Sequence, residues 1–188
     1  MNTLPIDRNV LQIRAPMLRR ALISGARRVI KHRDYLNKIN VFPVPDGDTG
    51  SNMAFTLGNV LSGALNRKAL STGELLRRVS EHAIDGARGN SGAILAQFFT
   101  GVSERIGASP IASIEQMVQA IRHGADTARQ ALSEPKEGTI LGVITAFAGS
   151  LQTDPRGFHF RHWFENALIA ARKALANTPN QLPVLQQA

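Results

Sequence analysis

The chain has 188 residues, of which 43% are hydrophobic, and this is enough for one domain with a buried core. Its formal net charge is +8 at pH 7, and it has no cysteine, which excludes disulfide bonds and thiolate metal sites. No apolar run of about 18 residues could span a membrane, and Asp7 and Arg8 interrupt the short apolar stretch that a signal peptide would need, so we expect a cytoplasmic protein.

The first predicted element is a basic helix that follows an N-terminal extension, residues 1–14. Apolar residues recur at helical spacing from Leu18 to Leu36. Nine of the 22 Lys and Arg lie in the first 40 residues, against two aspartates there. Such a helix could contact nucleic acid, anionic lipid or an acidic partner, or its charges could simply be solvated. Tyr35 is the only aromatic residue there for base stacking, so specific nucleic-acid binding is not expected.

The segment after this helix is a predicted loop, Val41–Gly50. Pro43 and Pro45 lack N–H groups and favour extended neighbours. Asp46 and Asp48 stand two residues apart, directly before a predicted helix start. Clustered carboxylates suit hard divalent cations, and the free N–H groups of a helix start suit phosphates. The loop is therefore a candidate Mg²⁺–nucleotide site, although Asp-Gly is also an ordinary turn dipeptide.

The spacing of the carboxylates excludes one kind of metal site and favours another. An EF-hand loop beginning at Asp46 would need glycine where Ser51 stands and glutamate where Leu57 stands. Asp46 and Asp48 with the nearby Asn40 suit Mg²⁺, which takes few protein ligands and completes its octahedron with phosphate oxygens and water.

The remainder of the chain predicts further helices and no strand pattern longer than a few residues. Apolar periodicity predicts a helix at 53–64, and a capping box at Ser71–Glu74 begins a helix that runs to Ile84. Another helix is predicted to begin after Gly92. The last three are predicted from Ser113 to Ala128, from Thr139 to Leu151 and from Trp163 to Leu175. A turn is predicted at Asp154–Gly157, and a short irregular end after Pro179. The five histidines show no metal-binding spacing, and we interpret them as surface or packing residues.

Three glycine-containing breaks separate these helices: Asp46–Asn52, Gly86–Gly92 and Glu137–Thr139. In an up-and-down bundle the second, fourth and sixth helices run the same way, so their N-termini gather at one end. The breaks lie directly before these helices and would meet at that rim, where positive helix ends suit a polyphosphate with Mg²⁺. Taken alone, Gly89–Gly92 could equally be an ordinary helix start. No Walker or dinucleotide-binding glycine motif is present.

The segment Asn37–Met53 closely resembles the signature of the DhaL domain. It is most similar to the branch found at the N-terminus of bacterial fatty acid kinases, which is related to the ATP-binding subunit of dihydroxyacetone kinase. Gly86–Gln97 and Glu137–Leu141 resemble the second and third family motifs, and Leu182–Ala188 resembles the segment leading to the last. The match covers residues 15–188 and implies an all-α, up-and-down antiparallel barrel of about eight helices, with ATP or ADP and two Mg²⁺ ions at one rim.

The resemblance also implies roles for individual residues. Asp46 and Asp48 would bind the metals, with Asn40 or a neighbour standing where dihydroxyacetone kinases have a third aspartate. The residues expected to hold the phosphates or border the nucleotide are Thr49, Gly50, Ser51, Asn52, Gly89, Asn90, Ser91, Gly92, Thr139, Ile140 and Leu141.

The implied reaction is transfer of the γ-phosphoryl group of ATP. The expected acceptor is a fatty acid presented by a partner acyl-binding protein. The alternatives are a dihydroxyacetone kinase-type subunit that works with a substrate-binding subunit, or a non-catalytic nucleotide-binding or scaffold fragment. The family continues beyond the position of Ala188 with a glycine-rich loop and a last helix. We therefore expect a domain truncated before that loop and helix, with weak or no activity alone.

Overall fold

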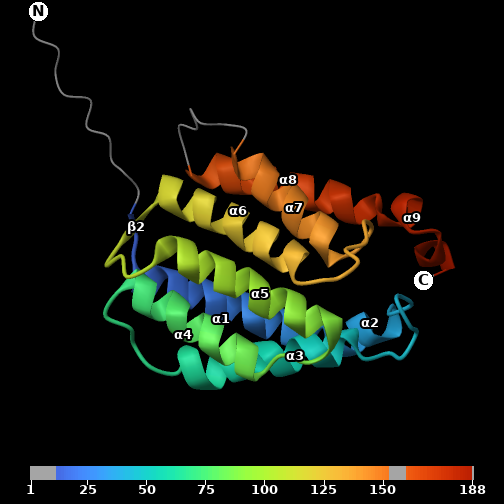
Figure 1. The fold of residues 1–188 in the computed structure, drawn as a ribbon, viewed down its shortest axis with the longest axis horizontal. Coiled ribbons are helices and arrows are strands. Elements are labelled where there is room, and N and C mark those ends of the chain that lie inside the picture. Colours follow the sequence, from blue (N-terminus) through green and yellow to red (C-terminus); the bar gives the residue numbers. More distant parts are fainter. Residues whose placement is uncertain (1–11, 153–159, 188) are drawn as a thin grey trace, which may run out of the picture.

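In a computed structural model that describes residues 12–152 and 160–187, about three quarters of the described residues are helical and almost none lie in strands, as the all-α prediction requires (Figure 1). The helices are α1 (Ala15–Lys31), α2 (Arg33–Lys38), α3 (Thr49–Asn59), α4 (Thr72–Asp85), α5 (Gly89–Ile106), α6 (Ile114–Gln130), α7 (Ile140–Gln152), α8 (Phe160–Ala176) and α9 (Thr178–Gln181). A π-helical turn, η1 (Val60–Ala64), extends α3, and a 3₁₀ turn, η2 (Pro183–Gln187), follows α9. The turn predicted at 154–157 and the first 11 residues of the predicted extension lie outside the described residues.

The helices pack in the order of the chain, so that neighbours in sequence are neighbours in space. Figure 1 shows α6, α7 and α8 along one side of the bundle and α1, α3, α4 and α5 along the other. The two sides meet where α5 packs against α6. A Cβ on Gly101 would come within 2.8 Å of the Cα of Gly124, so only glycines allow this close approach of the two backbones.

The core follows the apolar stripes that the sequence predicts. Leu75 and Val79 of α4 are fully buried against α1, α5 and η1. Burying one such side chain contributes about 2 kcal/mol to the free energy of folding. Trp163 of α8 is buried among residues of α6 and α7. Among the described residues, no helix is long and apolar enough to cross a membrane.

The predicted helix caps are present in the structure. Ser71 accepts a hydrogen bond from the Glu74 N–H at 3.0 Å, and Ser113 forms a complete capping box with Gln116. The first predicted helix, however, is interrupted. His32 leaves the helical conformation, with φ −97° and ψ 11°, so the expected single helix is two, α1 and α2.

Two arginines donate hydrogen bonds to backbone carbonyl oxygens at the end of the π-helical turn that follows α3. Arg78, whose residue surface is only 4% exposed, donates to the carbonyl oxygen of Ala64 at 2.7 Å. Arg19 of α1 donates through its Nε to the carbonyl oxygen of Leu65 at 2.9 Å. These bonds satisfy carbonyls that the end of a helix leaves without partners.

One end of the bundle is closed by hydrogen bonds between distant segments. The short strands β1 (Gln12–Ile13) and β2 (Ala112–Ser113) pair antiparallel. The Thr72 hydroxyl donates to the carbonyl oxygen of Ile13 at 2.9 Å, and the Thr72 N–H donates to the carbonyl oxygen of Pro110 at 3.0 Å. In Figure 1, β2 lies at the opposite end of the bundle from α2 and α9.

Candidate functional site

A cavity of about 1020 Å³ opens where α3, α5 and α7 begin. The three glycine-containing segments contribute to its lining although they are far apart in sequence. The lining residues from these segments, together with Ile140 directly after the third, are Asp46, Asp48, Thr49, Asn52, Gly89, Asn90, Ser91, Gly138, Thr139 and Ile140. The alternation of helix directions therefore brings these segments to one end of the bundle, and the volume suits a ligand of nucleotide size.

The two aspartates of the loop before α3 are available for a ligand. Asp46 and Asp48 are both exposed, and neither side-chain carboxylate has a hydrogen bond or ion pair among the described residues. Gly47 between them has a φ of 66°, a conformation that glycine adopts readily. Carboxylates left unpaired beside a helix start are oxygen donors of the kind Mg²⁺ prefers.

The donor set fits Mg²⁺ only together with a phosphate ligand. Within the described ranges, no group of three or more His, Cys, Asp or Glu side chains could hold a metal ion. Asp46 and Asp48 would thus supply part of an octahedral shell, and phosphate oxygens and water would complete it.

The start of α3 is closed by amide side chains from upstream. Asn40 Oδ1 accepts from the Thr49 N–H at 3.1 Å and from the Thr49 hydroxyl, and Asn40 Nδ2 donates to the carbonyl oxygen of Val44 at 2.8 Å. Asn37 Oδ1 accepts from the Ser51 N–H at 3.0 Å. Although Asn40 lines the cavity, its oxygen already has two donors, so its observed role is to cap α3.

Two predicted phosphate-binding residues of α3 lie away from the cavity, against α2. Gly50 is buried, and a Cβ there would overlap with the carbonyl oxygen of Arg33. The Ser51 hydroxyl accepts from Asn37 Nδ2 at 2.9 Å. The Arg33 guanidinium donates to Asp34 at 2.8 Å, and this bond, with the nearby negative charge, raises the pKa of Arg33. Gly50 and Ser51 therefore join α3 to α2.

The start of α5, in contrast, is open. No side chain caps this helix, and the N–H groups of Gly89, Asn90 and Ser91 have no hydrogen-bond acceptor among the described residues. Gly89 has a φ of 53°, and a Cβ there would overlap with the side-chain amide of Asn52. Three unpaired N–H groups at a helix N-terminus form a favourable environment for an anion.

Two other residues near the start of α5 do not line the cavity. Gly92 is buried, and a Cβ there would lie 2.6 Å from the Thr56 hydroxyl oxygen, so glycine allows α5 to pack against α3. Arg88 is exposed and donates to the carbonyl oxygen of Ala87 at 2.9 Å.

The third wall is the start of α7. The Thr139 hydroxyl accepts from the Leu141 N–H at 3.4 Å and donates to the carbonyl oxygen of Lys136 at 2.7 Å. Thr139 therefore caps α7, as the sequence predicts. Thr139 and Ile140 line the cavity, whereas Leu141 is 1% exposed and belongs to the core.

Two features of the cavity were not anticipated from the sequence. A charged pair, Lys136 and Glu134, lines it from the loop between α6 and α7. Large hydrophobic and aromatic side chains also line it, among them Tyr35, Phe42, Leu175, Leu182 and Leu185. These residues come from α2, the loop after it, the end of α8 and the C-terminal turns. In the sequence they look like ordinary loop residues or apolar positions of helices, and nothing in their immediate neighbourhood indicates that they share a cavity.

Comparisons with known proteins identify relatives of this chain. Residues 43–188 match the DAK2 domain family. An uncharacterized protein of Staphylococcus saprophyticus is 36% identical over 179 residues, which is 95% of this chain and 32% of the relative. Uncharacterized proteins of Staphylococcus haemolyticus and of Staphylococcus aureus strain USA300 are 36% and 34% identical over 167 residues, which is 88% of this chain and 30% of each relative. The chain thus spans about a third of the length of these relatives.

Proposed function

The chain belongs to the DAK2 domain family, the DhaL-type domain of dihydroxyacetone kinases, and from this premise we propose that its cavity binds ATP or ADP with Mg²⁺ for phosphoryl transfer. The observation that carries the proposal is that two kinds of unpaired group line the same cavity. Unpaired carboxylates, Asp46 and Asp48, share a cavity with the unpaired N–H groups of Gly89–Ser91. The carboxylates suit a cation and the N–H groups suit an anion, so together they suit a metal-bound polyphosphate.

Each of these groups has a proposed role. Asp46 and Asp48 would hold Mg²⁺, with two ions proposed from the resemblance, and bound Mg²⁺ would neutralise charge on the phosphate oxygens. The backbone of Gly89, Asn90 and Ser91 would donate hydrogen bonds to phosphate. Because these donors are fixed by α5 before the ligand arrives, they would stabilise developing charge without reorganisation.

The titratable residues of the cavity support a particular class of acceptor. The described residues that line it include Tyr35, the two aspartates, Glu134 and Lys136, but no histidine. An alcohol acceptor would require a general base in addition to the groups that hold the metal. A carboxylate acceptor is already an anion and needs none.

We therefore propose that the acceptor is a fatty acid carboxylate, presented to the cavity mouth by a partner acyl-binding protein. Phosphoryl transfer to a carboxylate oxygen would give an acyl phosphate and leave ADP. The rival acceptor is dihydroxyacetone held on a substrate-binding subunit. A purely structural role would need no nucleotide at all.

A binding and transfer experiment tests these proposals. We expect ADP to raise the melting temperature of the chain in Mg²⁺ but not in EDTA, and Asp46→Ala to lose this shift. With [γ-³²P]ATP, we expect label to reach a fatty acid only when an acyl-binding protein is present. No Mg²⁺-dependent shift with ADP, and identical behaviour of Asp46→Ala and the parent, would support a scaffold instead.

A further inference from the structure

We propose that Lys136 binds the terminal phosphate of the nucleotide directly, and that Glu134 holds the Lys136 ammonium group when no nucleotide is bound. The inference deepens the proposed function and rests on it. It concerns a residue outside the three glycine-containing segments that the sequence predicts to form the site.

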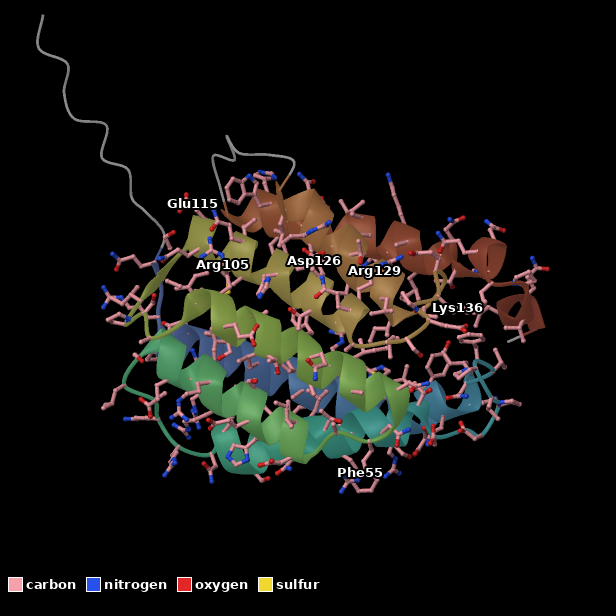
Figure 2. The ribbon with its side chains drawn as sticks, in the orientation of Figure 1. Phe55, Arg105, Glu115, Asp126, Arg129 and Lys136 are labelled. Atoms are coloured by element: carbon pink, nitrogen blue, oxygen red, sulfur yellow. The ribbon has the colours of Figure 1, made fainter. Side chains whose placement is uncertain are left out.

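The first observation is the distribution of positive charge around the cavity. Among the described residues that line it, Lys136 is the single Lys or Arg. The many basic residues of α1 do not contribute, and Arg88 does not line the cavity either. Figure 2 places Lys136 at the end of the bundle where the α6–α7 loop faces the loop before α3. A polyphosphate in this cavity would therefore meet one cationic side chain.

The second observation is that the backbone of Lys136 is fixed. Its carbonyl oxygen accepts from the Thr139 hydroxyl, which also caps α7. The next residue, Glu137, accepts a 2.5 Å hydrogen bond from the guanidinium group of Arg129 in α6, with which it forms an ion pair. Gly138, with a φ of 80°, packs against Leu182 and Thr178. The loop is thus attached to α6, α7 and the α9 segment, and it presents Lys136 from a defined position.

The third observation is the partner of the ammonium group. Lys136 Nζ lies 3.2 Å from Glu134 Oε2, and the two side chains are 53% and 78% exposed. An ion pair this exposed contributes little to stability, so a phosphate with more negative charge can replace the carboxylate at small cost. Glu134 would then both orient Lys136 and compete with the ligand for it.

The chemistry of the ligand explains why one lysine would matter. The transferred phosphoryl group and the leaving phosphate carry negative charge, and an ammonium group neutralises it as a mobile point charge. A charge-assisted hydrogen bond to phosphate is stronger than a neutral one, and arginine can make it too.

The test is isothermal titration of MgATP into five proteins: the parent chain, Lys136→Gln, Lys136→Arg, Glu134→Gln and Lys173→Gln. Lys173 is an exposed lysine of α8 that does not line the cavity, so its variant controls for the loss of one positive charge. We expect Lys136→Gln to raise the Kd about tenfold and Lys136→Arg to restore it to within roughly threefold of the parent. Glu134→Gln, which frees the ammonium group, should lower the Kd about two- to threefold, and Lys173→Gln should leave it unchanged.

The outcomes separate this inference from the proposed function. If the parent binds MgATP and Lys136→Gln matches Lys173→Gln, Lys136 has no role and only the inference fails. A Glu134→Gln variant that binds more weakly than the parent would also overturn the competing role of the carboxylate. If the parent does not bind MgATP, the proposed function fails and the inference fails with it.

Discussion

The Ser91 hydroxyl donates a hydrogen bond to the carbonyl oxygen of Thr49 at 3.2 Å, across 42 positions of sequence. This bond joins the first turn of α5 to the first turn of α3. It therefore links the segment with unpaired N–H groups to the segment that follows the two aspartates. The geometry of the proposed site depends on these two helix starts keeping their relative position.

We expect Ser91→Ala to lower the free energy of unfolding by about 1 kcal/mol, because the Thr49 carbonyl oxygen loses its partly buried partner. It should also weaken MgADP binding severalfold, since the two helix starts become less firmly connected. Chemical denaturation and calorimetric titration measure the two effects. Ser62→Ala is a matched control, because the exposed Ser62 hydroxyl bonds only within its own turn. Equal effects of the two substitutions would contradict the coupling.

Asp46→Asn and Asp48→Asn should each abolish the Mg²⁺-dependent effect of ADP on the melting temperature. Neither should lower the melting temperature of the ligand-free chain, because both carboxylates are exposed and unpaired. Asp85→Asn, which changes an exposed carboxylate at the end of α4, should respond to MgADP like the parent. A full MgADP response in both loop variants would exclude them as metal ligands.

Asn40→Ala should destabilise the ligand-free chain by about 1–2 kcal/mol, because the first N–H of α3 loses its acceptor. Asn40→Asp keeps an oxygen in the same position and places negative charge at a helix start, so it should recover most of that loss. Denaturation in EDTA measures both variants. A normal stability for Asn40→Ala without metal, combined with impaired Mg²⁺ binding, would indicate a metal ligand in place of a cap.

Gly50→Ala should lower the free energy of unfolding by about 2–4 kcal/mol, because its Cβ would overlap with the Arg33 carbonyl oxygen and force α3 away from α2. Gly58 lies in the same helix with no atom near its Cβ position, so Gly58→Ala should stabilise the chain by about 0.5–1 kcal/mol. Opposite signs in urea denaturation are the expected result. A stabilising Gly50→Ala would show that α2 and α3 are not held this closely.

The elements that the sequence predicts well are those set by local patterns. Apolar periodicity places the helices, and Ser71, Ser113 and Thr139 cap them as expected, because a cap involves residues only two or three apart. The break at His32 was not predicted, since the apolar stripe continues through it into α2.

The candidate site is predictable only in part, because some of its features depend on contacts between residues far apart in the sequence. The meeting of three helix starts follows from the alternation of helix directions, which needs no detailed packing. The capping of α3 by Asn37 and Asn40 involves partners 14 and 9 positions away, so no local motif signals it. The exclusion of Leu141 from the cavity depends on how α7 rotates against the core, and that is decided by packing. The binding roles of the individual residues stay predictions.

The hydrogen bonds that Thr72 makes to Ile13 and Pro110 join distant segments at the end of the bundle opposite the cavity. A label attached at that end would therefore sit on a well-connected part of the structure and far from the proposed site. Ala108 is exposed in the loop at that end, and the chain has no thiol of its own. A cysteine introduced there would carry a fluorophore at a single known position. The fluorescence anisotropy of the label would report the tumbling of the whole molecule, and the cavity at the other end would stay free for titration with ligands.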